Sequence, residues 1–469
     1  MRTRLKSKPN FTEGPLFFKI TAFAIPIMLT GLLQIAYSMA DNIVVGKFSG
    51  DPTALAAVGS TGSLTNLIIN LLFGIGAGAG VVVSQFYGAG ESERVSKSVH
   101  TAMFFSLLGG LAAGALGLVI ARPALELLGT KPEVLDGATL YLRIICIGIP
   151  ANAVYNFGAA ILRGCGNSRV PLFILAGSGA VNVLLNLFFV IVCNMSVAGV
   201  AYATIISQYL SATLVVLVLV RTKEEPYAIK LNELRISKPY LTRILRFGVP
   251  AGVASSMFGI ANVLMTGAVN SFDTTTVTAN TIASNIDALT LTAMSCFGQA
   301  SMTFTGQNFG ANKPERIKKS VLYSLIQVFT VGVAVSALEL IFARQLISLY
   351  LDKSLENAAL IEDTAVTIMT VMLATYFLCG LLDTVSGGLK GLGYTMTSMI
   401  INLVLICGFR MVWILGIFPK IGGIVALFLA YPISWVLAFI TAVIFFIFAY
   451  RRFKGALAAR DIDSVGEIV

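Results

Sequence analysis

Residues 85–99 read Gln85-Phe-Tyr-Gly-Ala-Gly-Glu-Ser-Glu-Arg-Val-Ser-Lys-Ser-Val99, and residues 307–321 read Gln307-Asn-Phe-Gly-Ala-Asn-Lys-Pro-Glu-Arg-Ile-Lys-Lys-Ser-Val321. Eight positions of these two stretches are identical, at a constant spacing of 222 residues. Further along the chain, Leu162-Arg-Gly-Cys-Gly166 matches Leu389-Lys-Gly-Leu-Gly393. Matches that recur in the same order are typical of an internal repeat. We therefore predict that the chain consists of two similar halves.

Long apolar runs surround both copies of the repeated stretch. They lie at 16–46, 54–87, 98–121, 135–161, 170–193 and 197–220 in the first half, and at 241–271, 276–308, 320–343, 360–388, 395–418 and 422–450 in the second. Each run is long enough to hold the roughly 20 residues that a membrane-spanning helix needs. The sequence thus predicts an all-α integral membrane fold, with twelve transmembrane helices in two six-helix lobes.

The composition excludes several classes of protein. Of the 469 residues, 56% are hydrophobic and only 12% are charged, whereas a soluble domain carries about 25% charged residues. A soluble enzyme and a nucleic-acid-binding protein are excluded on this ground. The glycine-rich run 74–80 lacks the Lys-Ser/Thr of a phosphate-binding loop, and the sequence contains no hydrolase motif. We therefore expect a protein that is not an enzyme and that holds no cofactor, bound metal or nucleic acid.

The basic residues are distributed unequally along the predicted topology. With the N-terminus inside, 24 Lys and Arg residues fall in cytoplasmic segments and 6 fall outside, as expected for cytoplasmic loops. The net charge of +10 is therefore a signal of topology. We expect a multi-pass protein of the inner cell membrane with both termini in the cytoplasm. Because each half has an even number of spans, the two lobes should be related by a pseudo-two-fold axis along the membrane normal.

The longest polar stretch separates the two halves and gives the predicted domain boundaries. Residues 1–220 should form the N-terminal six-helix lobe, and residues 239–451 the C-terminal six-helix lobe. Residues 221–238 should be a cytoplasmic linker, and residues 452–469 a cytoplasmic tail.

An ionisable residue inside a membrane span is energetically costly and usually functional. In the first half this residue is Asp41, near the outer end of the first span. Gln34 and Tyr37 precede Asp41 at spacings of seven and four residues, and so share its helical face. The alternative is that Asp41 caps its helix or meets water in the outer loop.

The fifth and sixth spans offer neutral ligands. Asn182 and Asn186 are four residues apart and lie on one helical face, where they can coordinate a cation or form interhelical hydrogen bonds. Thr204 can add a hydroxyl to the same cluster, or bond to a carbonyl of its own helix.

The second half carries more intramembrane acids: Asp287, Glu339 and Asp383. Asp383 aligns with Asn156 of the first half, so one half has a carboxylate where the other has an amide. Arg410 either neutralises Asp383, lines the pathway or forms a structural ion pair. Glu339 acts within the membrane or is solvated near the outer end of its span.

We predict a substrate cavity that takes residues from both halves. Its residues are Gln34, Tyr37, Asn156, Asp287, Tyr376, Asp383 and Arg410. The single histidine, His100, lies at the start of the third span and has no partner pattern. It is expected to be an interfacial residue rather than a proton relay.

These motifs together resemble the multidrug and toxic compound extrusion (MATE) family of cation-coupled transporters. The resemblance covers residues 15–450. The elements that carry it are Pro26, Asp41, Gln85-Phe-Tyr-Gly-Ala-Gly90, Leu162-Arg-Gly-Cys-Gly-Asn-Ser168, Asn182, the segment 199–204 and Gln307-Asn-Phe-Gly-Ala-Asn312.

The resemblance implies a V-shaped pair of lobes that exports compounds in exchange for protons or sodium ions. It also implies that Asp41, Asn182, Asn186 and Thr204 form the cation-coupling site. This sequence departs from the family pattern at Asn186, where related members have an acid. We expect Asp41 alone to be neutralised in this site, which favours protons as the coupling ion over sodium.

The resulting hypothesis is a secondary antiporter, acting as a monomer in the lipid bilayer, that exports lipophilic organic cations. Two alternatives remain open. One is a flippase or exporter of another amphipathic metabolite within the same superfamily, and the other is a membrane receptor that does not transport.

Overall fold

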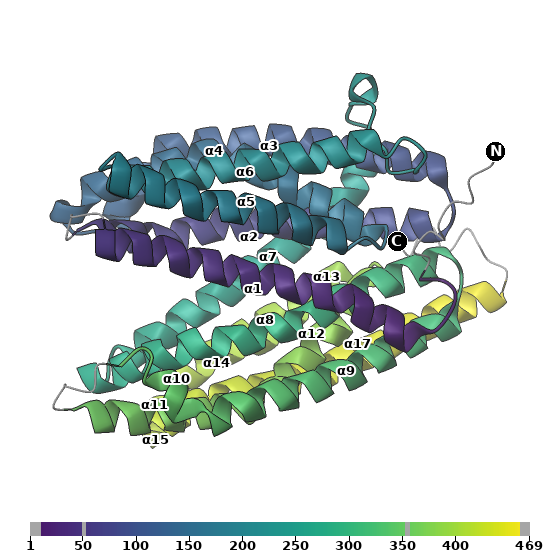
Figure 1. Ribbon diagram of the computed structural model, residues 1–469. Helices are drawn as coiled ribbons and strands as arrows, with labels where there is room; N and C mark the ends of the chain where they lie inside the picture. Colours follow the sequence, from purple (N-terminus) through teal and green to yellow (C-terminus); the bar gives the residue numbers. More distant parts are fainter. Residues whose placement is uncertain (1–10, 49–52, 352–356, 460–469) are drawn as a thin grey trace. The chain divides into compact units, whose positions relative to one another are not determined.

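The computed structural model describes residues 11–48, 53–351 and 357–459, and within these ranges the chain is helical and contains no strand (Figure 1). The first half contains α1 (Leu16–Phe48), α2 (Ala54–Gly88), α3 (Ser92–Leu127), α4 (Pro132–Gly164), α5 (Arg169–Leu187), the π-helix η1 (Phe188–Val192) and α6 (Val197–Arg221). A 3₁₀ turn, η2 (Leu231–Glu233), lies in the connection to the second half.

The second half repeats this order with more interruptions. It contains α7 (Lys238–Val269), α8 (Thr274–Gly310), α9 (Pro314–Ile341), α10 (Ala343–Ile347), α11 (Ala358–Leu373), α12 (Tyr376–Gly391), α13 (Thr395–Ile401), the π-helix η3 (Asn402–Gly408), α14 (Phe409–Val412), the π-helix η4 (Trp413–Ile417), α15 (Phe418–Ile421), α16 (Ile424–Phe428) and α17 (Ala430–Ala458).

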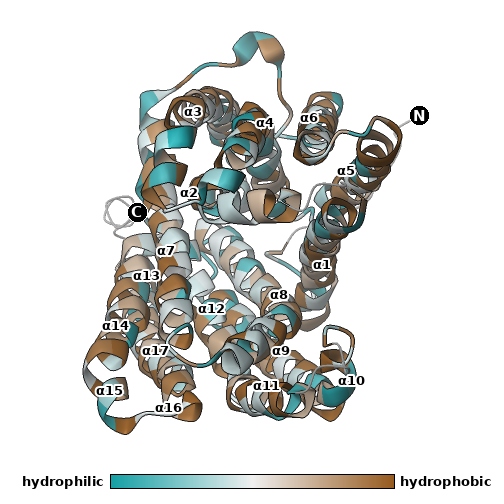
Figure 2. Ribbon diagram, turned by 90° about the vertical axis from the view of Figure 1, so that its left-hand side faces the viewer, coloured by the Kyte–Doolittle hydropathy of each residue, from teal (hydrophilic) through white to brown (hydrophobic). Residues whose placement is uncertain are grey.

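Most of these helices are long and apolar enough to cross a membrane. Among the described residues, eleven helical segments meet both conditions, and α11 with α12, the run α13 to α15, and α16 with α17 each count as one. The helix α8 is long enough, with 37 residues, but its first half is rich in Thr, Asn and Ser. Figure 2 shows hydrophobic residues along the helices. With α8, the predicted twelve-helix membrane fold is confirmed.

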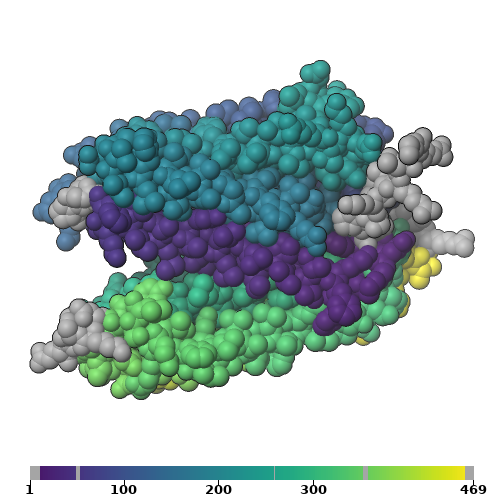
Figure 3. Space-filling view, viewed as in Figure 1, coloured from purple at the N-terminus to yellow at the C-terminus, as the bar shows by residue number. Residues whose placement is uncertain are grey.

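The exposed residues of α1 show which solvent these helices are built for. Phe18 of α1 is 73% exposed, and Phe17, Ile25 and Ile43 are exposed as well. Figure 3 shows residues of α1 at the surface of the molecule. Large apolar side chains that lie exposed along a 33-residue helix fit a lipid environment, in which they need no cover.

The described residues form two compact units, and each first helix of a half is divided between them. One unit comprises residues 29–252, and the other combines residues up to 28 with those from 253 onwards. The division of α1 falls just after Pro26, and that of α7 just after Pro250. Proline removes a backbone hydrogen bond inside a helix and favours a bend there. The predicted lobes 1–220 and 239–451 stay a prediction.

Each borrowed segment is held by close packing inside its unit. In the second unit, Phe11 stacks on Phe304 of α8 with ring centroids 3.9 Å apart. In the first unit, a Cβ atom added to Gly74 of α2 would lie 2.2 Å from the Gly252 Cα of α7. Glycine is required there because the two backbones approach too closely for a side chain.

The internal repeat extends from the sequence to individual contacts. Gly298 of α8 packs against Asp383 of α12, so that an added Cβ would lie 2.7 Å from its Oδ2. The equivalent glycine of the first half, Gly76, packs beside Asn156, whose backbone oxygen would lie 3.7 Å from the added Cβ. Asn156 and Asp383 are the residues that the aligned halves equate. The two halves therefore use the same helix contact with different polar groups.

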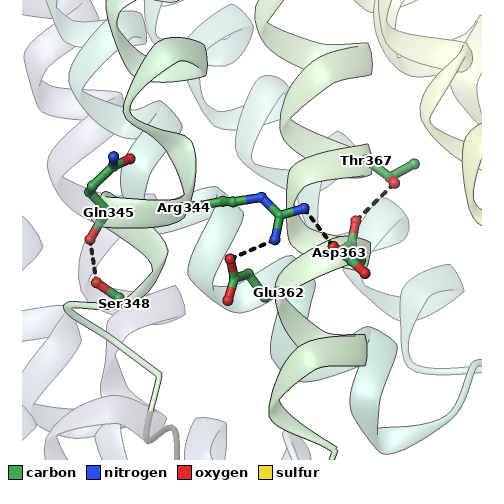
Figure 4. A network of polar contacts seen from close by, with 6 residues as sticks. All are labelled: Arg344, Gln345, Ser348, Glu362, Asp363 and Thr367. Carbon is green, nitrogen blue, oxygen red and sulfur yellow. Dashed lines mark hydrogen bonds and ion pairs between the residues drawn. The ribbon is translucent and has the colours of Figure 1, made fainter.

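An ion-pair pattern also repeats between the halves. Arg344 binds Glu362 and Asp363 of α11, each at 2.9 Å, as Figure 4 shows. Its counterpart in the repeat, Arg122, binds Glu126 and Asp136, each at 3.0 Å. All of these side chains except Glu362 are well exposed. The pairs tie successive helices together, and exposed ion pairs of this kind add little stability.

The single histidine differs from the prediction. His100 is buried, and its Nε2 accepts a hydrogen bond of 3.0 Å from the backbone N–H of Lys230. Its Nδ1 lies 2.7 Å from the backbone oxygen of Ser96, to which it donates. The expectation of an interfacial residue without a partner was wrong, because the connection between the halves folds back onto α3 and covers the ring.

Candidate functional site

The predicted coupling residues of the first unit form a hydrogen-bonded chain. Asn186 Nδ2 donates to Asp41 Oδ1, and it also lies 3.4 Å from Asn182 Oδ1. Asn182 and Asn186 face α1 together because residues four apart lie on one side of a helix. Asn186 is fully buried and Asn182 is 5% exposed. We call Asp41, Asn182 and Asn186 the Asp41 cluster.

The Asp41 cluster has spare capacity to bind a cation or a proton. Asn186 Oδ1 is buried and accepts no hydrogen bond from the described residues. An acceptor left unsatisfied in this way is costly. Val44, Val45, Leu142 and Val190 nearby belong to one buried apolar group, which keeps the surroundings poor in water. A proton or a monovalent cation can bind here between a carboxylate and an amide oxygen.

The other residues predicted for this region take different positions. The Thr204 hydroxyl donates to the backbone oxygen of Val200 at 2.9 Å, which is the helix-bonded alternative stated for it. Its oxygen still has a lone pair to offer. Gln34 is exposed. Asn156 is buried and donates to Asn152 Oδ1 at 2.8 Å, on α4.

Tyr37 sets the approach of α1 to α5. Its hydroxyl donates to the backbone oxygen of Ala176 at 3.1 Å. Its ring lies directly on Gly179, so that an added Cβ would lie 1.9 Å from the ring. Gly179 therefore lets α5 approach α1 in the turns that precede the contact between Asn186 and Asp41.

The backbone changes directly after the Asp41 cluster. The helix α5 ends at Leu187, and the next five residues form the π-helix η1. Short π-helical segments inside α-helices are frequent at functional sites. The eleventh span has two such segments, η3 and η4, and Arg410 lies in α14 between them.

Arg410 is the centre of a second polar group, in the second unit. Its side chain is fully buried, and its guanidinium lies 4.0 Å above the ring of Tyr431 and 5.9 Å from that of Trp435. Its Nε donates to the Ser434 hydroxyl at 3.3 Å. Cation–π contacts with two aromatic rings compensate for part of the lost hydration. Arg410 is thus held by aromatic and hydroxyl groups.

The remaining predicted residues of the second unit lie on α8 and α12. The Tyr376 hydroxyl donates a hydrogen bond to the Asp287 carboxylate. The ring of Tyr376 also packs against Trp435, with centroids 5.2 Å apart. Asp383 lies one helical stretch further along α12, against the backbone of Gly298. The structure thus connects Asp287 with Tyr376 and places Asp383 at a separate contact.

Three aromatic residues near these groups were not predicted. Tyr141 of α4 lies close enough to Asp41 to interact with its charge. Tyr431 and Trp435 enclose Arg410. Their spacing of four residues on an apolar span placed them on one helical face, and that aromatic pair was the available signal for a buried cation.

The fold and these groups define a membrane carrier of two similar helical halves. The MatE family profile matches residues 26–188 and 250–414. The chain therefore belongs to the MatE family, whose members are multi-pass membrane transporters.

Individual relatives cover almost the whole chain. A probable multidrug resistance protein of Bacillus subtilis, YoeA, is 25% identical over 459 residues, which are 96% of each protein. An FAD transporter of Shewanella oneidensis is 22% identical over 436 residues, covering 92% of this chain and 94% of that protein. The crystal structure of MATE in complex with MaL6 has the same fold, with a TM-score of 0.87 at 23% identity, covering 96% of this chain and 99% of that one.

Proposed function

We propose that this protein is a secondary antiporter that exports lipophilic organic cations in exchange for protons. Sodium is the alternative coupling ion. The observation that carries the proposal is the Asp41 cluster, in which a partly buried carboxylate and a free amide oxygen lie together. Membership of the MatE family and the multidrug resistance protein among its relatives support export of drug-like compounds.

The Asp41 cluster suits protons because it contains one carboxylate. With Asn186 in place of a second acid, a single proton on Asp41 neutralises the whole cluster. The Asn186 amide donates to the ionised carboxylate and loses part of that interaction when Asp41 is protonated. In the proposed cycle, an outside proton weakens the tie between α1 and α5, and α1 then moves and releases the exported compound.

Further parts of the proposal concern setting and cavity. We propose that the protein acts as a monomer in the inner cell membrane, with both termini in the cytoplasm. Gln34, Tyr37 and Asn156 in the first unit and Asp287, Tyr376, Asp383 and Arg410 in the second are the proposed substrate-binding residues. Three aromatic or acidic side chains among them, Tyr37, Tyr376 and Asp287, suit a flat organic cation.

The experiment that tests this function uses the purified full-length protein in proteoliposomes. Uptake of a panel of cationic dyes is measured under a pH gradient alone and under a sodium gradient alone. The expected result is transport driven by the pH gradient and abolished by Asp41→Asn. The matched control is Asp136→Asn, an exposed acid at the outer end of α4, which should transport normally. Transport by the sodium gradient alone would overturn proton coupling, and unchanged transport by Asp41→Asn would remove the Asp41 cluster from the mechanism.

A second candidate function is export of an amphipathic anion. It is favoured by the FAD transporter among the relatives and by the buried guanidinium of Arg410. The same panel tests it by including a flavin nucleotide. Gradient-driven movement of the flavin nucleotide with no movement of the cationic dyes would select this candidate.

A further inference from the structure

Two acidic side chains of the second unit lie close together, away from the Asp41 cluster. Asp287 is on α8 and Glu339 is near the end of α9. Glu339 lies close enough to Asp287 for the two charges to repel each other. Glu339 is only 6% exposed, which is unusual for a carboxylate without a basic partner. The alternative that Glu339 is solvated at the end of its span is thereby excluded.

Oxygen atoms from three helices surround this pair. The Thr290 hydroxyl, three residues after Asp287 on α8, lies beside the Glu339 carboxylate. Thr290 is fully buried, and its hydroxyl does not reach hydrogen-bond geometry with any described group. Tyr376 of α12 donates its hydroxyl to Asp287 from another direction. The arrangement therefore offers two carboxylates and a free hydroxyl to a small ligand.

The pair is not neutralised by the protein in the part of the chain that the structure describes. Neither carboxylate takes part in an ion pair there, and Glu339 Oε2 is buried without a hydrogen-bond donor. The other titratable groups that act on Asp287 are Cys379 and Tyr376 of α12 and Tyr431 of α17. None of these groups is cationic. Two adjacent negative charges in a water-poor site are strongly unfavourable unless a cation compensates for them.

We propose that Asp287, Glu339 and Thr290 form a second monovalent-cation site, which binds a proton or a sodium ion independently of the Asp41 cluster. Either ion neutralises one of the two charges. A proton would be shared between the carboxylates, as in other close acid pairs. A sodium ion would be coordinated by carboxylate and hydroxyl oxygens, the ligands that hard cations prefer.

The inference concerns binding and can be tested apart from transport. The purified full-length Asp41→Asn protein, which lacks the acid of the first cluster, is compared with the same protein carrying Glu339→Gln as well. Thermal unfolding in detergent is followed while sodium is titrated at constant pH and ionic strength with choline as the replacement. A second series varies pH in the absence of sodium.

We expect the Asp41→Asn protein to be stabilised by sodium or by lowering the pH, and Glu339→Gln to remove that dependence. A response in the sodium series assigns a sodium ion, and a response in the pH series alone assigns a proton. Thr290→Val, which keeps both carboxylates and the shape of the side chain, should weaken sodium binding at least tenfold if sodium is the ligand and leave the pH response in place if a proton is.

The result that would overturn the proposal is an equal dependence on sodium and pH with and without Glu339→Gln. If Glu339→Gln does not fold, Asp287→Asn replaces it, with the same expected loss. Glu362→Gln, an acid of the ion-pair network of Figure 4, serves as the control and should keep the full response. A loss of stability that does not depend on the cation would show that Glu339 has only a structural role.

Discussion

Replacing Gly179 by alanine should disconnect the Asp41 cluster without touching any of its residues. The added Cβ would lie 1.9 Å from the ring of Tyr37, whereas ordinary van der Waals contact begins at 3.4 Å. The ring or the helix must therefore move by about 1.5 Å, a displacement that exceeds the range of a hydrogen bond. Because Tyr37 and Asp41 share α1, and Gly179 and Asn186 share α5, separating these helices breaks the bond from Asn186 to Asp41.

The size of the effect follows from the hydrogen bond that is lost. A hydrogen bond to a charged group contributes about 1.5–3 kcal/mol, which corresponds to roughly a 10- to 100-fold change in an equilibrium constant. We expect Gly179→Ala to weaken the affinity for the coupling ion by about this factor. The assay is the dependence of dye transport in proteoliposomes on the concentration of the coupling ion.

Two matched variants make this test specific. Gly177→Ala lies on the same helix at a position with no atom within 4 Å of the added Cβ, and it should behave like the wild type. The double variant Tyr37→Ala with Gly179→Ala removes the obstructing ring and should recover most of the lost affinity. The reasoning is refuted if Gly179→Ala retains wild-type ion dependence, or if the double variant is no better than the single one.

Four further predictions concern packing, charge and the connection between the halves. Gly74→Ala should lower stability by about 1–3 kcal/mol through overpacking, because its Cβ would meet the backbone of Gly252; the unfolding temperature in detergent should drop, while Gly59→Ala, with nothing within 4 Å, leaves it unchanged. Arg344→Gln should lower that temperature far less than Gly74→Ala, since Arg344 is exposed and surface ion pairs are weak, and the difference should vanish at high salt; a large drop that persists in salt would contradict this. His100→Leu removes the acceptor for the Lys230 N–H and should speed tryptic cleavage after Lys230, whereas His100→Gln, which can still accept, should cleave slowly; equal rates for both variants would show that the ring does not hold the connection. The hydrogen bond from Lys230 lowers the pKa of Glu233 below its ordinary value, so this tie is present at neutral pH and is lost as the pH falls through that lowered pKa; hydrogen exchange around η2 should rise in acid for the wild type and be already fast at neutral pH for Glu233→Gln.

The helices and the repeat could be predicted because their signals are local. Apolar runs of membrane length give the spans directly, and identical residues at a constant spacing give the duplication. The same reasoning placed Asn182 and Asn186 on one face, since that depends only on the period of the helix. The helix α8 was predicted as a span even though its Thr- and Asn-rich first half makes it less apolar than the others.

The features that were missed depend on which helices meet. Nothing in the spacing of Asp287 and Glu339, 52 positions apart, shows that α8 and α9 bring them together. The enclosure of Arg410 by Tyr431 likewise requires α14 and α17 to pack side by side. The π-helices were not predicted either, because a shift of the hydrogen-bond pattern by one residue leaves hardly any trace in a hydropathy profile.

The division of α1 and α7 has a consequence for how such a chain could have arisen. Each compact unit contains the opening segment of the other half, so a single ancestral half would have lacked part of its own core. That ancestor would have been complete only as a pair of identical chains that exchanged their first segments, in the manner of a domain-swapped dimer. Fusion of the two genes then made the exchange intramolecular. For the same reason, two fragments separated at the connection 222–237 should be stable only when they are co-expressed.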